Sequence, residues 1–283
     1  MLDAAMYGSA TMQEPISGEV DGRAVQVFDL EQPRFKGMPV HDSHQPGYFY
    51  SLHRRHSDAI RNGIEGARTG SSGVIVAMEH SGTHIDALCH QAVDLRFYGG
   101  VPAEESVLNG GYAHHGVEQI GPIVARGVLL DVARHRGVES LVTGDVVSAE
   151  ELQAVAEAEG VGIRAGDVVL VRTGNDLVWN DPARYLPGPG MDGSASKWLA
   201  GIGIEATGAD TMAWDAIGLW DTELNMELPG HATFLVEHGI YIIENLYLKA
   251  LSDADAWIFT FVCTPLKFTG ATGSMVSPIA IVR

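Results

Sequence analysis

The sequence predicts an α/β fold built on a mixed, largely buried sheet with flanking helices. Short apolar runs rich in β-branched residues recur along the chain, and segments with helical periodicity lie between them. Apolar runs without alternation are typical of strands covered on both faces, whereas a strand with one face in water alternates apolar and polar residues. Strands and helices that mix in this way are typical of an α/β domain.

Seven segments show the strand pattern. Each is a short run of mostly valine, isoleucine, leucine or phenylalanine, which suits the usual length and composition of a strand. We expect these segments to form the buried sheet. In chain order they are 24–30, 73–78, 127–133, 167–174, 241–246, 257–266 and 277–282.

Three segments show helical periodicity. The clearest is 148–160, where Ser148 is a candidate N-cap, an apolar face follows, and Gly160 is the stop. A second helix is expected at 194–203, which starts with a capping serine. A third is expected at 229–239, which ends in a glycine after an apolar stripe.

The composition favours one domain over residues 1–283, with 1–24 as an N-terminal extension, because no repeat or flexible linker divides the chain. The two cysteines, Cys89 and Cys263, are far apart, so we expect no disulfide framework and a reducing compartment. The start of the chain lacks a signal-peptide pattern and no apolar run has the length of a bilayer span. We therefore expect a cytoplasmic protein that does not bind membranes.

The net charge of −18 and the scattered lysines and arginines argue against nucleic acid as a partner. A small molecule is the expected partner. An acidic chain can still bind an anionic substrate where a metal ion sets the local field.

The stretch EHSGTHIDALCHQ (79–91) contains the candidate site. His80, His84 and Asp86 offer the nitrogen and oxygen ligands of a hydrolytic divalent metal. Gly82 makes a continuous helix costly, so we expect a tight turn and then a short extended piece in which His84 and Asp86 share one face. The zincin metalloprotease pattern is excluded, because serine rather than glutamate follows the first histidine.

Other residues leave alternatives open. His90 could be a further ligand or a proton shuttle, and each histidine taken singly could be a polar loop residue held by the backbone. His231 and Glu244 form a second candidate pair, because Glu244 interrupts an apolar run and a buried carboxylate needs a cation or hydrogen-bond donors. A simple salt bridge is the other interpretation of this pair. Cys89 is better explained as a small apolar filler than as a nucleophile.

The stretch HSGTHIDALCH resembles the signature His-x-Gly-Thr-His-x-Asp-x-Pro-x-His of the metal-dependent cyclase-like hydrolase family, which includes kynurenine formamidase and isatin hydrolase. Further segments resemble the family in the same order over roughly 25–283. The matching signature residues are His80, Gly82, Thr83, His84, Asp86 and His90. The chain departs from the family's two prolines and its C-terminal arginine at Leu88, Met275 and Ser277.

This resemblance implies a swivelling β/β/α architecture and a homodimer or homotetramer. It implies that His80, His84 and Asp86 bind manganese, or alternatively zinc, and that His90 is the catalytic histidine. The insertion 41–73, the length of the chain and the lost arginine favour isatin hydrolase or a related cyclic amidase within the family.

The same resemblance places His231 and Glu244 at positions that, with the equivalent of Asp86, hold a second metal in formamidase-like members. Isatin hydrolase-like members hold a single manganese, so the occupancy of a second position stays open.

The expected activity is hydrolysis of a cyclic amide C–N bond, from isatin to isatinate or in a related lactam. A metal-activated water attacks the carbonyl and His90 shuttles the proton. Apolar or aromatic walls would orient the flat ring. Candidates for these walls are Phe49, Tyr50, Trp214 and Trp220.

Three alternatives stay open for the function. One is an arylformamidase that hydrolyses N-formylkynurenine, and another is a lactamase acting on a small bicyclic γ-lactam. The third, from a different class, is a non-catalytic metal-binding or interaction protein.

Overall fold

The computed structural model describes residues 14–59 and 68–283, and its centre is a large mixed sheet. The strands lie in the order β1-β2-β18-β16-β8-β10-β12-β15-β5-β17. The four neighbours β8, β10, β12 and β15 are parallel, and the other pairings in this sheet are antiparallel. The strands are β1 (Ile16–Val20), β2 (Arg23–Asp29), β5 (His84–Asp86), β8 (Ile123–Asp131), β10 (Val168–Arg172), β12 (Ala206–Ala209), β15 (Tyr241–Glu244), β16 (Ile258–Cys263), β17 (Gly273–Met275) and β18 (Ile279–Val282).

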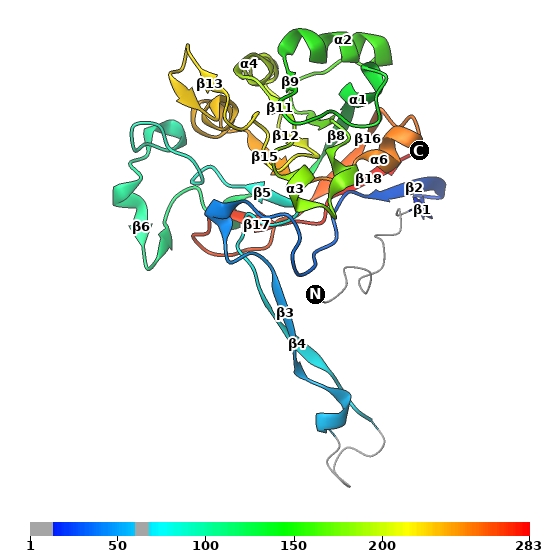
Figure 1. Ribbon diagram of the computed structural model, residues 1–283, viewed down its shortest axis with the longest axis vertical. Coiled ribbons are helices and arrows are strands. Elements are labelled where there is room, and N and C mark those ends of the chain that lie inside the picture. Colours follow the sequence, from blue (N-terminus) through cyan, green and yellow to red (C-terminus); the bar gives the residue numbers. More distant parts are fainter. Residues whose placement is uncertain (1–13, 60–67) are drawn as a thin grey trace.

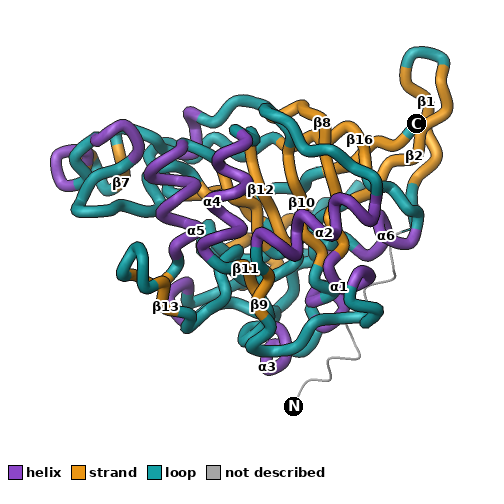
Figure 2. Tube along the Cα trace, turned by 90° about the horizontal axis from the view of Figure 1, so that it is seen from above, coloured by secondary structure: helices purple, strands orange, loops and turns teal. Residues whose placement is uncertain are grey.

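The longest helices cover one face of the sheet, and irregular segments with one short helix cover the other. The longest helices, α2 (Ala149–Glu159) and α4 (Gly193–Ile202), lie across the strands (Figure 2). On β10, Val169 packs with the residues of α2 and α4, whereas Leu170 packs in a second core that contains Leu30. The central strands are therefore buried on both faces. This confirms the predicted α/β fold with a largely buried sheet.

Shorter elements complete the fold. The remaining helices are α1 (Val132–His135), α3 (Pro182–Tyr185), α5 (Pro229–His231), which continues into a π-helix (Ala232–His238), and α6 (Lys249–Asp253). Among the described residues, four small strand pairs lie outside the main sheet: β3 (Phe49–Arg54) with β4 (Ser72–Val76), β6 (Val107–Leu108) with β7 (Gly111–Tyr112), β9 (Val146–Val147) with β11 (Gly190–Met191), and β13 (Trp220–Asp221) with β14 (Met226–Glu227).

The helix boundaries follow from capping side chains. The predicted cap of α2 is confirmed, because Ser148 accepts a hydrogen bond from the backbone of the first turn and Gly160 ends the helix with φ +68°. The predicted serine cap of α4 is wrong. Asp192 caps this helix by accepting from the Ala195 amide at 3.0 Å, while the Ser194 hydroxyl donates to that carboxylate at 2.6 Å. A carboxylate at the N-cap satisfies the free amides as well as a hydroxyl does.

Two strand predictions need correction. The run 73–78 is not part of the buried sheet: Ser72–Val76 pairs only with β3 in a hairpin that projects from the body (Figure 1), and both strands are exposed throughout. In contrast, β12 was not predicted from its small residues. Its Gly208 lies so close to β15 that an added Cβ would be 2.8 Å from the Ile243 carbonyl oxygen, so the small side chain allows the close strand packing.

Part of the predicted N-terminal extension belongs to the sheet. β1 falls within this extension and forms one edge of the main sheet, beside β2.

Within the residues that the structure describes, no helix has both the length and the apolar character needed to span a bilayer.

Candidate metal centre

Strand pairing brings two distant parts of the chain together. β5 lies between β15 and β17, and His84 of β5 is directly opposite Glu244 of β15. Directly opposed side chains of an antiparallel pair lie on one face, and Asp86 shares that face because it is two residues after His84. The predicted short extended piece is confirmed. The register explains why Glu244, which interrupts an apolar strand, lies beside the histidine stretch.

His80 reaches the same place from the turn before β5. Gly82 in this turn has φ +66°, a conformation that glycine adopts without strain. The Nδ1 atom of His80 lies 2.8 Å from Asp86 Oδ1, and the Nε2 atom of His84 lies 3.4 Å from that same oxygen. Ligand atoms of the three residues lie within 4.8 Å of one another. The structure thus brings His80, His84 and Asp86 together.

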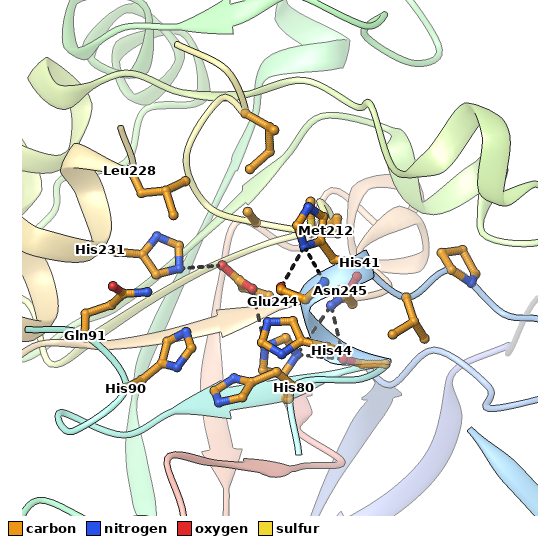
Figure 3. Close-up of a pocket in the computed structure, with 17 residues that line it drawn as sticks. His41, His44, His80, His90, Gln91, Met212, Leu228, His231, Glu244 and Asn245 are labelled. Atoms are coloured by element: carbon orange, nitrogen blue, oxygen red, sulfur yellow. Dashed lines mark hydrogen bonds and ion pairs between the residues drawn. The ribbon is translucent and has the colours of Figure 1, made fainter. Parts of the chain in front are cut away.

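His231 and Glu244 extend the cluster, and their side chains face each other (Figure 3). His231 Nε2 is 3.3 Å from Glu244 Oε1 and 3.7 Å from Asp86 Oδ2. The second oxygen of Glu244 is 3.3 Å from His84 Nε2. The predicted pair therefore lies in the site, and Asp86 sits between two groups of ligand atoms.

Each histidine has a partner on the ring nitrogen that faces away from the cluster centre. His84 Nδ1 is 2.8 Å from the Gly82 carbonyl oxygen, and His231 Nδ1 is 2.6 Å from Asp215 Oδ2. His80 Nε2 is 2.7 Å from the Thr272 hydroxyl. Such partners fix the ring orientation and the tautomer, which leaves the other nitrogen free to bind a metal.

The donor set fits a divalent metal ion. Asp86 is completely buried, and its Oδ2 atom has no hydrogen-bond partner among the described residues. A buried carboxylate oxygen without a donor is costly unless a cation lies beside it. Two histidines and a carboxylate with an adjoining cavity are also the usual ligands of a metal site that binds a substrate.

The titration of the cluster agrees with a cation site. Burial and the charge of Asp86 oppose ionisation of Glu244, yet hydrogen bonds from His231 and His84 lower its pKa to about 2. Burial also opposes charge on His84, but the two carboxylates raise its pKa to about 10. Both carboxylates are therefore anionic, and a metal ion that binds His84 must displace its proton.

His90 stands beside this cluster as a neutral ring. Its ring stacks on that of His80 at a centroid distance of 3.9 Å and lies 6.1 Å from that of His231. Burial lowers the pKa of His90 to about 3. His90 also forms a group with Asp86 and His231 whose ligand atoms lie within 4.8 Å. The geometry thus allows either of its predicted roles, ligand or proton carrier.

A cavity of about 300 Å³ opens over the cluster (Figure 3). The histidines and Glu244 contribute polar lining. The apolar lining comes from Pro39, Val40, Met212, Ile217 and Leu228. A small molecule with both polar and apolar parts would match this lining.

The four aromatic residues predicted to line the pocket lie elsewhere. Phe49 and Tyr50 are half-exposed on the projecting hairpin, and Trp220 is exposed on β13. Trp214 is completely buried, where its indole donates to Ser196 and its backbone amide donates to Glu244 Oε1 at 2.8 Å. Trp214 therefore holds a cluster carboxylate through its backbone and does not form a wall of the cavity.

Sequence reasoning missed several residues of the site. His44 lines the cavity with its ring 5.0 Å from that of His80, and Asp215 and Thr272 hold two of the histidines. The His-x-x-His spacing of His41 and His44 was the available signal for the cavity lining. The roles of Asp215 and Thr272 depend on tertiary contacts and leave no local pattern.

Cys89 is next to His90 in the sequence, but its side chain does not line the cavity over the metal centre. It is buried in the core, and burial raises the pKa of its thiol to about 12. A thiol that stays protonated is a poor nucleophile. This agrees with its interpretation as a small apolar filler.

Comparison with known proteins identifies a family that the chain matches. Residues 28–216 match the profile of the Cyclase family, described as "Putative cyclase". Cyclase-like protein 2 of Oryza sativa subsp. japonica is 27% identical over 206 residues, which cover 71% of this chain and 62% of that protein. The match thus spans less than two thirds of that relative.

Solved structures share the fold at lower identity. A protein described as a novel cyclase superimposes with a TM-score of 0.79 at 24% identity, over 91% of this chain and 86% of that chain. Isatin hydrolase A from Ralstonia solanacearum gives a TM-score of 0.67 at 23% identity, over 92% of each chain. Both similarities are similarities of fold.

Proposed function

The chain belongs to the Cyclase family, and we propose that it is a metal-dependent hydrolase that opens the C–N bond of a cyclic amide, with isatin or a related lactam as its substrate. The fold shared with an isatin hydrolase over 92% of each chain supports this choice of substrate class. The apolar cavity beside the histidine and carboxylate cluster supports it independently, because isatin is small, flat and polar along one edge.

The observation on which the proposal chiefly rests is the position of Asp86. Its two oxygens face two groups of histidine nitrogens, and one of these oxygens is buried without a donor. A purely structural ion pair would satisfy both oxygens with hydrogen bonds. An arrangement that leaves one unsatisfied is what a metal ligand requires.

In this proposal His80, His84 and Asp86 hold the metal, with Mn²⁺ as the ion and Zn²⁺ as the alternative. When bound, the ion polarises the substrate carbonyl and makes hydroxide available from water near neutral pH. His231 and Glu244 either support this site or hold a second ion with Asp86. Asp215 orients His231 for both arrangements.

His90 moves the proton in this scheme. Water adds to the amide carbonyl carbon, the C–N bond breaks, and the proton released by water is returned to the departing nitrogen. His90 lines the cavity with its ring stacked on that of His80, a position from which it can accept that proton and then donate it. The apolar residues Val40, Met212 and Leu228 hold the ring while the carbonyl faces the cluster.

Loss of isatin absorbance on adding the enzyme tests the proposal. We expect turnover that stops after exhaustive chelation and returns on adding Mn²⁺ or Zn²⁺. Activity that is untouched by chelation would exclude the metal mechanism. Absence of turnover with isatin and with a bicyclic γ-lactam panel would exclude the proposed substrate class.

A second candidate is arylformamidase activity. The paired ligand groups on either side of Asp86 favour it, since two metal positions are what the family resemblance associates with formamidase-like members. N-formylkynurenine assayed beside isatin under the same conditions separates the two. A non-catalytic metal-binding role would instead be indicated by a metal whose coordination shell is closed by protein ligands.

A further inference from the structure

Glu79 directly precedes the candidate ligand His80, and the proposed hydrolysis gives it no role. Its side chain is 29% exposed and reaches Thr272, the residue before β17, which lies beside β5 (Figure 1). The Oε1 atom of Glu79 accepts hydrogen bonds from the Thr272 hydroxyl and, at 3.1 Å, from the Thr272 backbone amide. The same hydroxyl lies 2.7 Å from His80 Nε2. Glu79, Thr272 and His80 therefore form a chain of hydrogen bonds that leads to the metal centre.

The Thr272 hydroxyl is the link between the carboxylate and the imidazole. Glu79 Oε1 is 3.8 Å from His80 Nε2, which is longer than a hydrogen bond. A direct bond between these two side chains is therefore absent, and any effect of Glu79 on the ring must pass through the hydroxyl that contacts both.

The backbone holds Thr272 in the position that this link requires. Its carbonyl oxygen accepts from the Ala87 amide at 2.9 Å, just after β5. The next residue, Gly273, is opposite Asp86 in the sheet. A Cβ added at Gly273 would lie 2.6 Å from His80 Cε1, so the missing side chain gives the ring the space to reach the hydroxyl.

The carboxylate sets the direction of these hydrogen bonds. A carboxylate only accepts, and a hydroxyl has a single hydrogen to donate. Because Thr272 donates its hydrogen to Glu79, its hydroxyl can only accept from His80 Nε2. A neutral His80 ring therefore carries its hydrogen on Nε2 and its lone pair on Nδ1, which is 2.8 Å from Asp86 Oδ1. Two acceptors that face each other at this distance are favourable only when a cation lies beside both.

We propose that Glu79 is a positioning residue of the metal centre, which acts through the Thr272 hydroxyl and makes Nδ1 the metal-binding nitrogen of His80. A carboxylate behind a metal-binding histidine fixes the ring and raises the basicity of the nitrogen that faces the metal. His84 has the opposite arrangement, since its Nδ1 is 2.8 Å from the Gly82 carbonyl oxygen and its Nε2 faces the cluster. This inference rests on the metal centre of the proposed function, but not on its substrate.

Zinc affinity of the full chain tests the proposal without substrate. Metal-depleted protein is titrated with Zn²⁺ against a chromogenic chelator. We expect Thr272→Val and Glu79→Gln each to weaken zinc binding about 10- to 100-fold. A glutamine can donate as well as accept, so it no longer fixes the direction of the hydroxyl. Thr272→Ser keeps the hydroxyl and should bind zinc as the unaltered chain does.

Glu105→Gln is the matched control for the loss of one negative charge, because Glu105 is exposed and lies outside the cavity lining. Its zinc affinity should be unchanged. The double variant Thr272→Val with Glu79→Gln should bind zinc about as well as Thr272→Val alone, since Glu79 acts through the hydroxyl. Effects that add fully in the double variant would overturn the proposal in favour of a general effect of charge.

Nuclear magnetic resonance of zinc-loaded protein with ¹⁵N-labelled histidine shows which ring nitrogen carries the hydrogen. We expect the hydrogen of His80 on Nε2. A hydrogen on Nδ1, or unchanged zinc affinity in Thr272→Val and Glu79→Gln, would overturn the proposal. Weakened zinc binding in these variants of a chain that hydrolyses no cyclic amide would support it while contradicting the proposed hydrolysis. An unaltered chain that binds no zinc would overturn both.

Discussion

Substitutions of two histidines, His84 and His90, distinguish metal binding from proton transfer. His84 lies 3.4 Å from Asp86 Oδ1 and 3.3 Å from Glu244 Oε2, in the centre of the ligand atoms, whereas His90 stacks beside them. We expect His84→Ala to lose both the metal and activity. We expect His90→Ala to keep the metal and to lose about 10²- to 10⁴-fold in kcat. Metal content by mass spectrometry and steady-state kinetics measure the two effects.

Loss of metal in both variants would contradict this assignment and make His90 a ligand. His115→Ala is a suitable control, since its half-buried imidazole contacts the Tyr98 backbone, outside the cavity lining. This variant should keep both metal and activity.

At the residue scale, the ligands that are close in sequence could be predicted and their partners could not. His80, His84 and Asp86 lie within one short segment, so their spacing alone indicates a shared face. Asp215 and Thr272 support histidines from other parts of the chain. Only the folded structure brings them near, because no local pattern distinguishes them from other polar loop residues.

The turn at Gly82, before β5, orients His84 towards the cluster. Gly82 has φ +66°, and an added Cβ would lie 3.0 Å from Arg34 Nε. We expect Gly82→Ala to cost about 1–2 kcal/mol of folding stability and to weaken metal binding about 10- to 100-fold, because His84 is oriented by the Gly82 carbonyl. Denaturant titration and metal titration check these effects.

Gly121→Ala is the matched control for this substitution. An added Cβ at Gly121 meets no atom within 4 Å, and its φ is not in the left-handed region. Its stability and metal affinity should be unchanged. Equal effects of the two substitutions would show that the turn conformation does not matter.

The end of helix α2 provides a pH-dependent prediction. Burial raises the pKa of Glu159 from 4.5 to about 7, although its Oε1 accepts a hydrogen bond from the Asp131 amide at 3.0 Å. The folded protein therefore binds this proton more tightly than the unfolded chain, so the contribution of Glu159 to the free energy of unfolding falls as pH rises from about 4.5 to about 7.

Glu159→Gln removes the charge and keeps the acceptor. We expect this variant to be more stable than the unaltered chain by about 1–2 kcal/mol at about pH 8, and equally stable near pH 4. Urea titration of both proteins at each pH gives the difference. A stability gain of the same size at both pH values would contradict the assigned pKa.

At the element scale, apolar runs predicted strands well but did not predict which surfaces cover them. The runs that became β8, β10, β15 and β16 lie in the main sheet, as expected. The run at β4 has the same composition, yet it is exposed in the β3–β4 hairpin. Composition indicates that a strand is apolar, but not whether the chain's own core covers it.

At the scale of the whole molecule, sheet order creates the site. β5 and β15 are far apart in sequence and adjacent in the sheet, so the histidine stretch and Glu244 meet. Sequence could predict that both were functional candidates. It could not place them together, because register between distant strands depends on the packing of the whole sheet.

Anomalous diffraction from crystals grown with Mn²⁺ or Zn²⁺ tests the central claim most directly. Data collected at the absorption edge of each metal locate the ion independently of any activity assay. The account predicts an anomalous peak at coordination distance, about 2.0–2.3 Å, from His80, His84 and Asp86, with one position open to the cavity. In protein shown to contain metal, a peak elsewhere and none at this cluster would contradict it.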